Sequence, residues 1–389
     1  MLKPPLPPEI ERILAEIARY RSPRGEAEDM APRWQAALEQ VSCHTPGVTV
    51  AEGGEIVHLG GLSPGCQACK DGCWDIVFIT MRCNLSCAFC YSPLRLPPEH
   101  AGSVYGATPE EMVARYRALG IRGVGLSGGE PFLELERLVD WLQSFKRLYP
   151  QAYYWVYTNG LLAEEAALYR LAELGLDEIR FNLAATGYDH PRVLDNLATA
   201  ARLLPQVTVE IPAIPADAEK LLACLPVWAA LGVRTLNLHE LIYEPGTPSE
   251  HMPGERVALC APDGRRVLTH PGSRRLALKV LAQVAEQGLP LRVNDCSLQS
   301  KFRQLRGRRR NIYALLKPET EKLVEDREYE TVCAFRGAGL HFIHPDEYPA
   351  ARRRMPGYRF IRLRRLAPLA LQSPPQWVDW EELGEDAAG

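Results

Sequence analysis

The 389-residue sequence predicts an α/β protein in which strands and helices alternate. Two observations carry this prediction. From Asp75 onward, short runs of β-branched and aromatic residues are separated by stretches whose apolar residues recur with a period near 3.6. Each strand-helix-strand unit places its two strands parallel, so the pattern predicts either an open doubly wound sheet or an incomplete barrel. In both, functional residues gather at the carboxyl ends of the strands.

The predicted elements of this main domain follow one another in strict alternation. The six strands cover residues 75–80, 123–126, 153–157, 178–182, 207–211 and 235–239. The five helices between them cover residues 108–119, 133–148, 162–174, 190–203 and 217–230. The first helix opens with Thr108 as its N-cap, Pro109 at the next position and two glutamates in its first turn.

Segments of different character flank the alternating region. The N-terminal part predicts two amphipathic helices, over 7–21 and 25–42, and a hairpin that turns at Gly53-Gly54. The C-terminal part predicts a helix over 273–287 and a strand over 290–294, followed by a basic stretch. The predicted domains are an N-terminal appendage, a main domain and a C-terminal extension, over 1–74, 75–245 and 246–389.

Composition places the chain among ordinary globular proteins. Hydrophobic residues make up 46% of the sequence, charged residues 24%, and the net charge is −3, which excludes a disordered or collagen-like chain. The proline-rich N-terminus lacks the apolar core of a signal peptide, and no run reaches the 18 or so apolar residues of a membrane span. We therefore expect a cytoplasmic protein with no membrane partner.

A cysteine-rich loop follows the first predicted strand. Cys83, Cys87 and Cys90 are spaced Cys-x3-Cys-x2-Cys. A 4Fe-4S cluster has four corners, so three thiolates leave one iron open for an external ligand, whereas a structural zinc site closes its fourth position with a protein ligand. The spacing favours a catalytic 4Fe-4S cluster. The alternatives are three packing cysteines or a non-catalytic iron–sulfur or zinc protein.

With Phe89 just before its last cysteine, this loop resembles the signature of the radical S-adenosylmethionine (radical SAM) superfamily. The resemblance implies a 4Fe-4S cluster whose open iron binds S-adenosylmethionine. It also implies reductive cleavage of that molecule to a 5′-deoxyadenosyl radical, which abstracts a hydrogen atom from a substrate. An electron donor such as flavodoxin or ferredoxin is then an implied partner. The implied fold is a partial (βα)6 barrel over residues 75–245.

Motifs at later strand ends agree with this resemblance. Ser127-Gly128-Gly129-Glu130-Pro, after the second strand, resembles the family's Gly-Gly-Glu motif, in which the backbone and the acid receive the methionine ammonium group. The resemblance further implies contacts with the cofactor at three positions on the next strands and contacts with the substrate at two positions on the sixth. The three cofactor positions are Asn159, Asn182 and Glu210, and the two substrate positions are His239 and Glu240.

Cysteines outside the loop indicate a second metal site. Cys66 and Cys69, spaced Cys-x2-Cys, form half of a site for zinc, a single iron or a second cluster, with unpaired surface thiols as the alternative. Together with Val293-Asn-Asp-Cys-Ser ahead of a basic segment, they resemble a poorly characterised group related to pyruvate formate-lyase activating enzyme. That resemblance implies Cys66, Cys69 and Cys296 as ligands, with Cys333 as the favoured fourth and Cys73 as the runner-up.

The C-terminal part is strongly basic. Residues 296–375 contain 17 Lys and Arg against 8 Asp and Glu. Such an excess suits RNA phosphates or an acidic peptide, although a solvated arginine-rich face gives the same count.

Taken together, the sequence predicts a radical SAM enzyme that modifies a peptide, an RNA or a small molecule directly. The alternative within the class is an activase of a glycyl-radical enzyme.

Overall fold

The fold is described from a computed structural model, which covers residues 6–20, 30–91, 107–260, 266–337, 339–368 and 376–383. The chain forms two compact units. The barrel unit comprises Ala27–Cys260 and Arg266–Gln304, and the terminal unit comprises Met1–Glu26, Ala261–Arg265 and Leu305–Gly389. These units differ from the predicted division after residues 74 and 245, because part of each predicted flanking segment joins the sheet of the barrel unit.

One nine-stranded sheet forms the centre of the barrel unit, in the order β1-β2-β11-β8-β7-β6-β5-β4-β3. Strands β3 to β8 are parallel to their neighbours, and β11 lies parallel beside β8. The parallel strands are β3 (Trp74–Thr80), β4 (Gly123–Gly128), β5 (Tyr153–Thr158), β6 (Glu178–Phe181), β7 (Val207–Ala213), β8 (Thr235–Glu240) and β11 (Arg292–Cys296). All six predicted strands form, and the strand predicted near 290–294 adds a seventh. The predicted α/β partial barrel is confirmed.

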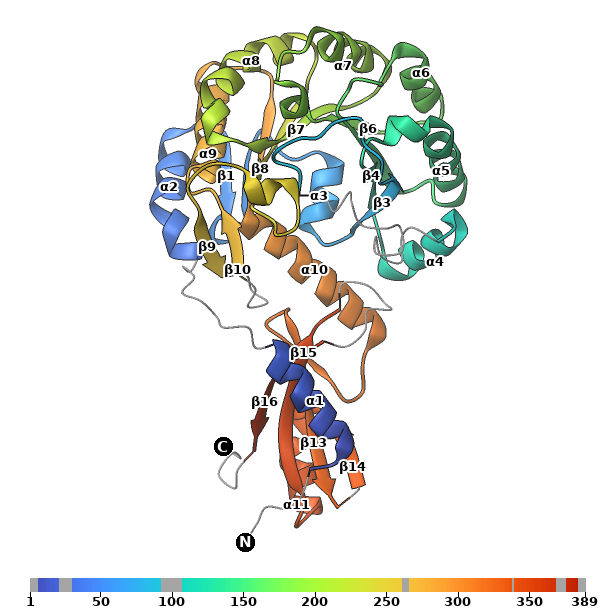
Figure 1. Cartoon of the computed structure of the whole chain (residues 1–389), viewed down its shortest axis with the longest axis vertical. Helices are drawn as coiled ribbons and strands as arrows, with labels where there is room; N and C mark the ends of the chain where they lie inside the picture. Colours follow the sequence, from blue (N-terminus) through green and yellow to red (C-terminus); the bar gives the residue numbers. More distant parts are fainter. Residues whose placement is uncertain are drawn as a thin grey trace. The chain divides into compact units, whose positions relative to one another are not determined.

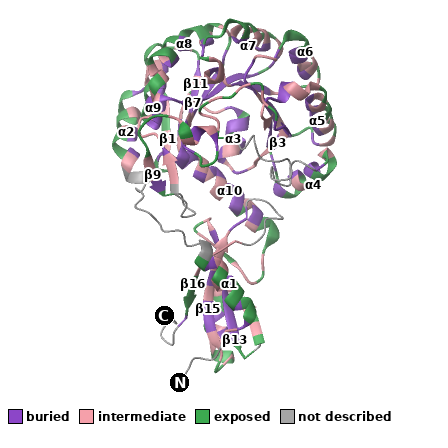
Figure 2. Cartoon of the chain, in the orientation of Figure 1, coloured by how far each residue is buried: buried purple, intermediate pink, exposed green. Residues whose placement is uncertain are grey.

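Helices cover the outer side of this sheet (Figure 1). They are α4 (Pro109–Leu119), α5 (Leu135–Leu148), α6 (Glu165–Glu173), α7 (Pro191–Leu203), α8 (Ala218–Ala230) and α9 (Ser273–Glu286). Their outward sides are exposed while the strands are largely buried (Figure 2), as expected where helices pack one apolar face on a sheet. The predicted cap of α4 forms, because the Thr108 hydroxyl accepts from the Glu111 N–H and the Glu111 carboxylate accepts from the Thr108 N–H.

The predicted N-terminal hairpin is part of the barrel sheet. Its strands are β1 (Val48–Ala51) and β2 (Ile56–Leu59), and β2 runs antiparallel to β11. Helix α2 (Met30–His44) packs beside the hairpin turn, where a Cβ on Gly54 would lie 2.2 Å from the Leu38 side chain. The hairpin therefore extends the sheet beyond its parallel strands.

A short helix lies against the inner side of the sheet. This helix is α3 (Pro64–Lys70), and Ser63 is its N-cap. The Ser63 hydroxyl accepts from the Cys66 N–H at 3.2 Å and donates to the Glu178 carboxylate on β6 at 3.2 Å. A Cβ on Gly65 would lie 2.5 Å from the Arg180 guanidinium and 3.1 Å from the Trp155 ring. Glycine at this position lets α3 approach β5 and β6 closely, and the helix stands within the ring of strands (Figure 1).

The remaining elements of the barrel unit follow β8 in the sequence. A two-stranded sheet pairs β9 (Val257–Cys260) with β10 (Arg266–Thr269). Helix α10 (Leu298–Leu316) follows β11 and continues into the terminal unit. Within the described ranges, no helix is both long enough and apolar enough to cross a membrane.

The terminal unit is an antiparallel sheet covered by the N-terminal helix. Its elements are α1 (Pro8–Tyr20), β12 (Lys322–Val324), β13 (Glu328–Arg336), β14 (Gly339–Ile343), α11 (Tyr348–Arg354), β15 (Arg359–Leu366) and β16 (Trp377–Glu382). Strand β13 pairs with β12, β14 and β15, and β15 pairs with β16. Three isoleucines of α1, at positions 10, 13 and 17, pack on Ile361 and Leu363 of β15. The unit thus has an apolar core of its own.

Candidate functional site

The predicted cluster loop directly follows β3. The Arg82 N–H donates to the Thr80 hydroxyl at 3.1 Å, which turns the chain out of the strand, and the Cys90 N–H donates to the Cys87 carbonyl at 3.1 Å. All three predicted cysteines are half-buried, and the Cys87 thiol lies within electrostatic range of the other two. Burial raises the pKa of Cys83 and raises that of Cys87 to about 11. The Cys83 and Cys87 thiols therefore favour the neutral form until a metal supplies the compensating charge.

The end of β4 is joined to this loop through its backbone. The Gly129 N–H donates to the Thr80 carbonyl and the Glu130 N–H to the Arg82 carbonyl, each at 2.8 Å. A Cβ on Gly128 would lie 1.9 Å from the Thr80 oxygen, and one on Gly129 would lie 2.0 Å from the Arg82 oxygen. Both glycines are required by this close approach. Ser127, just before them, pairs with Phe78 of β3.

The Glu130 carboxylate is directed at β5. Its side chain is buried, and it accepts from the Asn159 N–H at 2.7 Å, the Thr158 hydroxyl at 2.9 Å and the Phe132 N–H at 3.2 Å. Burial outweighs these hydrogen bonds and raises the pKa of Glu130 to about 7. The acid predicted to receive an ammonium group thus also joins the ends of two strands.

Asn159, predicted to contact the cofactor, holds the cluster loop in this structure. Its side-chain amide donates to the Asn84 side-chain oxygen at 2.7 Å, and its oxygen accepts from the Leu161 N–H at 3.1 Å. Asn182 similarly accepts from the Ala185 N–H at 3.3 Å and caps the short helix η4 (Leu183–Thr186). Phe89 is half-buried in the loop. The asparagines therefore have structural partners beside any cofactor role.

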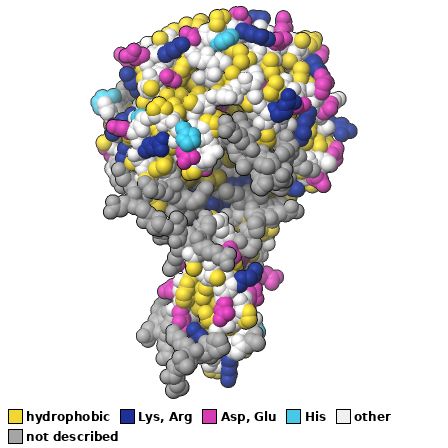
Figure 3. Space-filling view, viewed as in Figure 1, with side chains coloured by type: hydrophobic (Ala, Val, Ile, Leu, Met, Phe, Trp, Pro, Cys, Tyr) yellow, Lys and Arg dark blue, Asp and Glu magenta, His cyan; other side chains and the backbone are white. Residues whose placement is uncertain are grey.

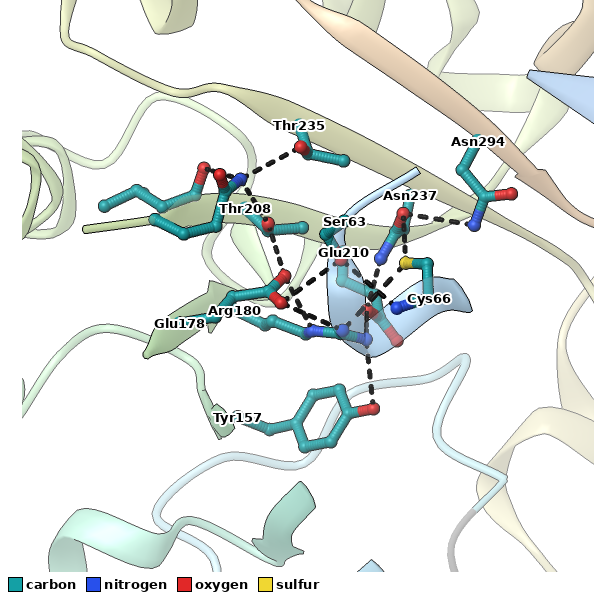
Figure 4. Close-up of polar contacts among 12 residues, drawn as sticks. Ser63, Cys66, Tyr157, Glu178, Arg180, Thr208, Glu210, Thr235, Asn237 and Asn294 are labelled. Atoms are coloured by element: carbon teal, nitrogen blue, oxygen red, sulfur yellow. Dashed lines mark hydrogen bonds and ion pairs between the residues drawn. The ribbon is translucent and has the colours of Figure 1, made fainter. Parts of the chain in front are cut away.

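A buried ionic network lies inside the barrel unit next to α3 (Figure 4). At its centre, Arg180 donates to Glu178 at 3.0 Å and to Glu210 at 2.8 Å. The guanidinium also lies over the Trp155 ring, 4.4 Å from its centroid. Glu210 further accepts from the Asn237 amide at 2.8 Å. Burial alone would raise the pKa of Glu210, but Arg180 and His239 lower it, so this predicted cofactor residue is an ionised member of the network.

The two residues predicted to face the substrate lie in different surroundings. His239 Nε2 lies 2.7 Å from a Glu210 oxygen, and burial together with the nearby Lys301 ammonium lowers the pKa of this histidine. Glu240 is buried, and its carboxylate accepts from the Leu298 N–H at 2.9 Å and the Thr269 hydroxyl at 3.1 Å. Glu240 thus caps the start of α10, while His239 extends the ionic network.

The predicted auxiliary cysteines fall into two groups. Cys66 and Cys69 lie on α3 and Cys296 ends β11, all in the barrel unit. The predicted fourth ligand, Cys333, is fully buried in the apolar core of the terminal unit. The runner-up, Cys73, donates to the Asp71 carbonyl at 3.6 Å just before β3. Within the described residues, no three Cys, His, Asp or Glu side chains could hold a metal ion as they stand.

The arginines of the predicted basic stretch are largely neutralised by acids. On β15, Arg362 and Arg364 both bind Glu330, at 3.2 and 2.9 Å, and Arg365 binds Glu321 at 2.6 Å. On the face seen in Figure 3, acidic and basic side chains of the terminal unit are interspersed. The excess of positive charge in the sequence is therefore not a continuous basic patch on these residues.

Sequence reasoning did not single out Glu178, Arg180, Ser63 or Lys301. The first two carried a signal, because a carboxylate and a guanidinium two residues apart on a strand share one face. A strand of a parallel sheet is normally apolar on both faces, so a charged pair there indicates a buried network. The partners of Ser63 and Lys301 depend on contacts between distant segments.

Comparison with known proteins agrees with the fold and the cysteine loop. The model of the Radical SAM superfamily matches residues 77–222. A Methanocaldococcus jannaschii protein named as a glycyl-radical enzyme activating enzyme is 28% identical over 233 residues, which cover 57% of this chain and 60% of that protein. A GTP 3′,8-cyclase of Limosilactobacillus fermentum is 31% identical over 139 residues, covering 33% of this chain and 41% of that protein. The chain therefore spans 60% or less of these curated relatives.

Solved structures show a weaker likeness. Streptococcus suis SuiB bound to S-adenosylmethionine has a TM-score of 0.43 at 13% identity, covering 57% of this chain and 49% of that one. Methylornithine synthase (PylB) has a TM-score of 0.41 at 14% identity, covering 74% of this chain and 81% of that one.

The parallel partial barrel and the three-cysteine loop after its first parallel strand define a class of iron–sulfur proteins. The match over residues 77–222 identifies this part of the chain as similar to the Radical SAM superfamily, as the loop predicted. The superfamily uses a 4Fe-4S cluster and S-adenosylmethionine.

Proposed function

We propose that this chain cleaves S-adenosylmethionine reductively and uses the resulting radical to abstract a hydrogen atom from a substrate. The observation that carries the proposal is the attachment of the cysteine loop to the Gly-Gly-Glu turn, through two backbone hydrogen bonds of 2.8 Å. That attachment sets a three-thiol loop beside a turn whose glycines leave no side chain in the way. A flavodoxin or ferredoxin is the proposed electron donor.

The donor set fits a 4Fe-4S cluster. Cys83, Cys87 and Cys90 provide three soft sulfur ligands on one short loop, and a fourth corner remains for an external ligand. When bound and reduced, such a cluster supplies the electron that splits S-adenosylmethionine into methionine and a 5′-deoxyadenosyl radical. The thiols must lose their protons to bind iron, and the raised pKa values of Cys83 and Cys87 mean that binding the metal and releasing those protons are coupled.

The chain's own residues hold the loop and place the cofactor. Asn159 fixes Asn84, which lies between the first two cysteines, and Glu130 fixes the backbone of Asn159. We propose that the backbone beside Gly128 and Gly129 receives the methionine ammonium group. Glu130 is buried beside that turn, and its negative charge when ionised favours a cation there.

For the substrate, we propose direct modification of a peptide, an RNA or a small molecule. The interior of the barrel unit supports this choice, because His239 and the nearby Lys301 bring polar groups to the carboxyl ends of β8 and β11. The interspersed charges of the terminal unit make RNA the weakest of the three substrates.

A second candidate function is activation of a glycyl-radical enzyme. One observation favours it, namely the 28% identity to the Methanocaldococcus jannaschii protein named as such an activating enzyme. In that function the abstracted hydrogen would come from a glycine of a partner protein.

The central test is the yield of 5′-deoxyadenosine after anaerobic reconstitution with iron and sulfide and reduction with dithionite. We expect formation from the natural chain and background yield when Cys83, Cys87 and Cys90 are all replaced by Ala. Cys43→Ala, at an exposed cysteine of α2, is the matched control and should leave the yield unchanged. No 5′-deoxyadenosine from the natural chain would refute the proposal.

The two candidate functions differ in which added substrate should stimulate cleavage of S-adenosylmethionine. Pyruvate formate-lyase, a tryptic peptide pool and total RNA serve as probes in parallel reactions. An electron paramagnetic resonance doublet of a glycyl radical on pyruvate formate-lyase would favour activation. A rise in 5′-deoxyadenosine with peptide or RNA, together with a mass change in that probe, would favour direct modification.

A further inference from the structure

The last cysteine of the cluster loop is held by a segment that follows β8. The Ser249 N–H donates to the Cys90 carbonyl at 3.1 Å. Ser249 belongs to the short helix η6 (Pro248–His251), which is distant from the loop in the sequence. The cluster loop is therefore attached at both ends, to the Gly-Gly-Glu turn near its start and to η6 at its last cysteine.

The turn before η6 fixes the direction of this N–H. Ser249 is fully buried, and its hydroxyl accepts from the Glu244 N–H at 3.0 Å and lies 2.9 Å from the Thr247 hydroxyl. The Thr247 hydroxyl in turn donates to the Glu244 carbonyl at 2.8 Å. Because these polar groups have their partners inside the turn, the Ser249 N–H is presented to the cluster loop in one orientation.

The chain leading into this turn is tied to the rest of the barrel unit. The Tyr243 N–H donates to the Leu268 carbonyl of β10 at 2.9 Å. The Leu241 N–H donates to the Ser273 hydroxyl, at the start of α9, at 2.8 Å. The turn therefore connects a fixed part of the barrel unit to the backbone of the last cluster-loop cysteine.

A second contact lies at the next residue, Tyr91. The Lys301 ammonium of α10 lies 5.3 Å from the centroid of the Tyr91 ring, within the range at which a cation is attracted to a ring face. Among the residues that the structure describes, no carboxylate lies within 4.0 Å of this ammonium. No directly paired acid there neutralises its positive charge.

We propose that Ser249 and Lys301 are positioning residues for Cys90, the last ligand of the cluster. The proposal rests on the proposed function, in which Cys90 binds one iron of the 4Fe-4S cluster. Ser249 fixes the backbone of that ligand in advance of metal binding. Lys301 holds the neighbouring side chain and adds a positive charge near the cluster, which raises the reduction potential because reduction adds negative charge. Both residues lie beyond residue 222, where the match to the superfamily ends.

The first test needs no cluster. The chain without bound metal is alkylated with iodoacetamide, and tandem mass spectrometry gives the rate at each cysteine. Ser249→Ala removes the hydroxyl that fixes the turn, so we expect the rate at Cys90 to rise about fivefold and the rate at Cys83 to change less than about twofold. Ser144→Ala, at a half-buried serine of α5, is the matched control and should change neither rate. An unchanged rate at Cys90, or an equal rise at both cysteines, would overturn the role of Ser249.

A second variant removes the donor itself. Ser249→Pro lacks the amide hydrogen, so the alkylation rate at Cys90 should rise at least as far as in Ser249→Ala. A rate at the natural level in Ser249→Pro would show that this N–H does not hold Cys90. Ser249→Ala keeps its amide hydrogen and is the milder of the two changes, so the first test does not depend on a proline fitting the turn.

The role of Lys301 is tested on the reconstituted chain. A redox titration followed by electron paramagnetic resonance gives the midpoint potential of the cluster whose signal is lost when Cys83, Cys87 and Cys90 are all replaced by Ala. Lys301→Met removes the charge but keeps a long side chain, so we expect the equilibrium constant for reduction to fall about fivefold. Lys301→Arg keeps the charge and should stay within about twofold of the natural value. Lys279→Met removes an exposed lysine of α9 and should leave the potential unchanged.

The possible failures of this titration are distinct. An unchanged potential in Lys301→Met would overturn the role of Lys301 and leave the proposed function standing. The absence of any reducible cluster in the natural chain would overturn both. The alkylation rates are measured without a cluster, so the role of Ser249 and the proposed function can fail independently.

Discussion

At the residue scale, Glu130 connects three parts of the barrel unit. Its carboxylate accepts two backbone N–H groups, from Asn159 and Phe132, as well as the Thr158 hydroxyl. Glu130→Ala leaves these buried donors without an acceptor, so we expect the free energy of unfolding to fall by about 3 kcal/mol. Denaturant unfolding of the chain without a bound cluster measures this change in free energy. The control, Glu134→Ala, removes a partly exposed acid paired with exposed Arg82, and an equal loss there would contradict the role of Glu130.

The same carboxyl predicts a dependence of stability on pH. Burial raises the pKa of Glu130 from 4.5 to about 7 in the folded chain, so the folded state holds its proton longer than the unfolded state. Its contribution to stability is present below about pH 4.5 and is lost as pH rises through about 7. Relative to Glu130→Gln, the natural chain should lose about 3 kcal/mol of unfolding free energy between about pH 4.5 and about pH 8. A relative gain over that range would contradict the raised pKa.

Side-chain roles were the part that sequence predicted least well. The motif identified Glu130 and Asn159, yet their partners lie on other strands or on the cluster loop. Glu240 shows the same dependence on a distant partner, because its carboxylate caps a helix that begins 58 residues later in the sequence. A position at a strand's carboxyl end predicts that a side chain is near the site. It does not predict whether cofactor, substrate or protein binds that side chain.

At the element scale, the sequence predicted the strands and helices of the barrel unit well. Alternation of β-branched runs with amphipathic stretches is a local pattern, and local patterns fix where an element begins and ends. The place of the hairpin was not predictable, because β2 pairs with β11, which lies more than 200 residues away. For the same reason, the sequence indicated a metal half-site in the segment that forms α3, but it could not place that helix inside the sheet.

The junction between β4 and the cluster loop gives a prediction at this scale. A Cβ on Gly129 would lie 2.0 Å from the Arg82 carbonyl oxygen, so Gly129→Ala must push the loop away from the turn. We expect a loss of about 2 kcal/mol in unfolding free energy and at least about half of the iron held by the cluster loop, measured after reconstitution. Gly339→Ala is the control, because its Cβ would meet only the Arg336 oxygen, at 3.4 Å. Equal iron in both variants would contradict the requirement for glycine.

At the scale of the whole molecule, the predicted site residues and the arginine-rich strands lie mostly in different units. Every predicted site residue except Cys333 belongs to the barrel unit, while the arginine-rich strands belong to the terminal unit. Each unit has its own buried core, and the ion pairs are buried in the barrel unit and half-buried in the terminal unit. This division explains why the local charge of residues 296–375 was a poor guide to function: the pairing of arginines with acids across β13 and β15 appears only once the sheet has formed.

The division gives a prediction that concerns both units. Glu330 on β13 is largely buried and binds Arg362 and Arg364 of β15. Glu330→Gln removes the carboxylate that both guanidinium groups share, and of the two only Arg362 keeps a second acid, Glu381 at 2.8 Å. We therefore expect the terminal unit to lose about 2 kcal/mol of stability, seen as an earlier transition in denaturant unfolding. Because Cys83, Cys87 and Cys90, the proposed cluster ligands, lie in the barrel unit, the iron content after reconstitution should stay at the natural level. Iron loss in Glu330→Gln would contradict the assignment of bound iron to the barrel unit alone, and would support Cys333, on the same strand, as a metal ligand.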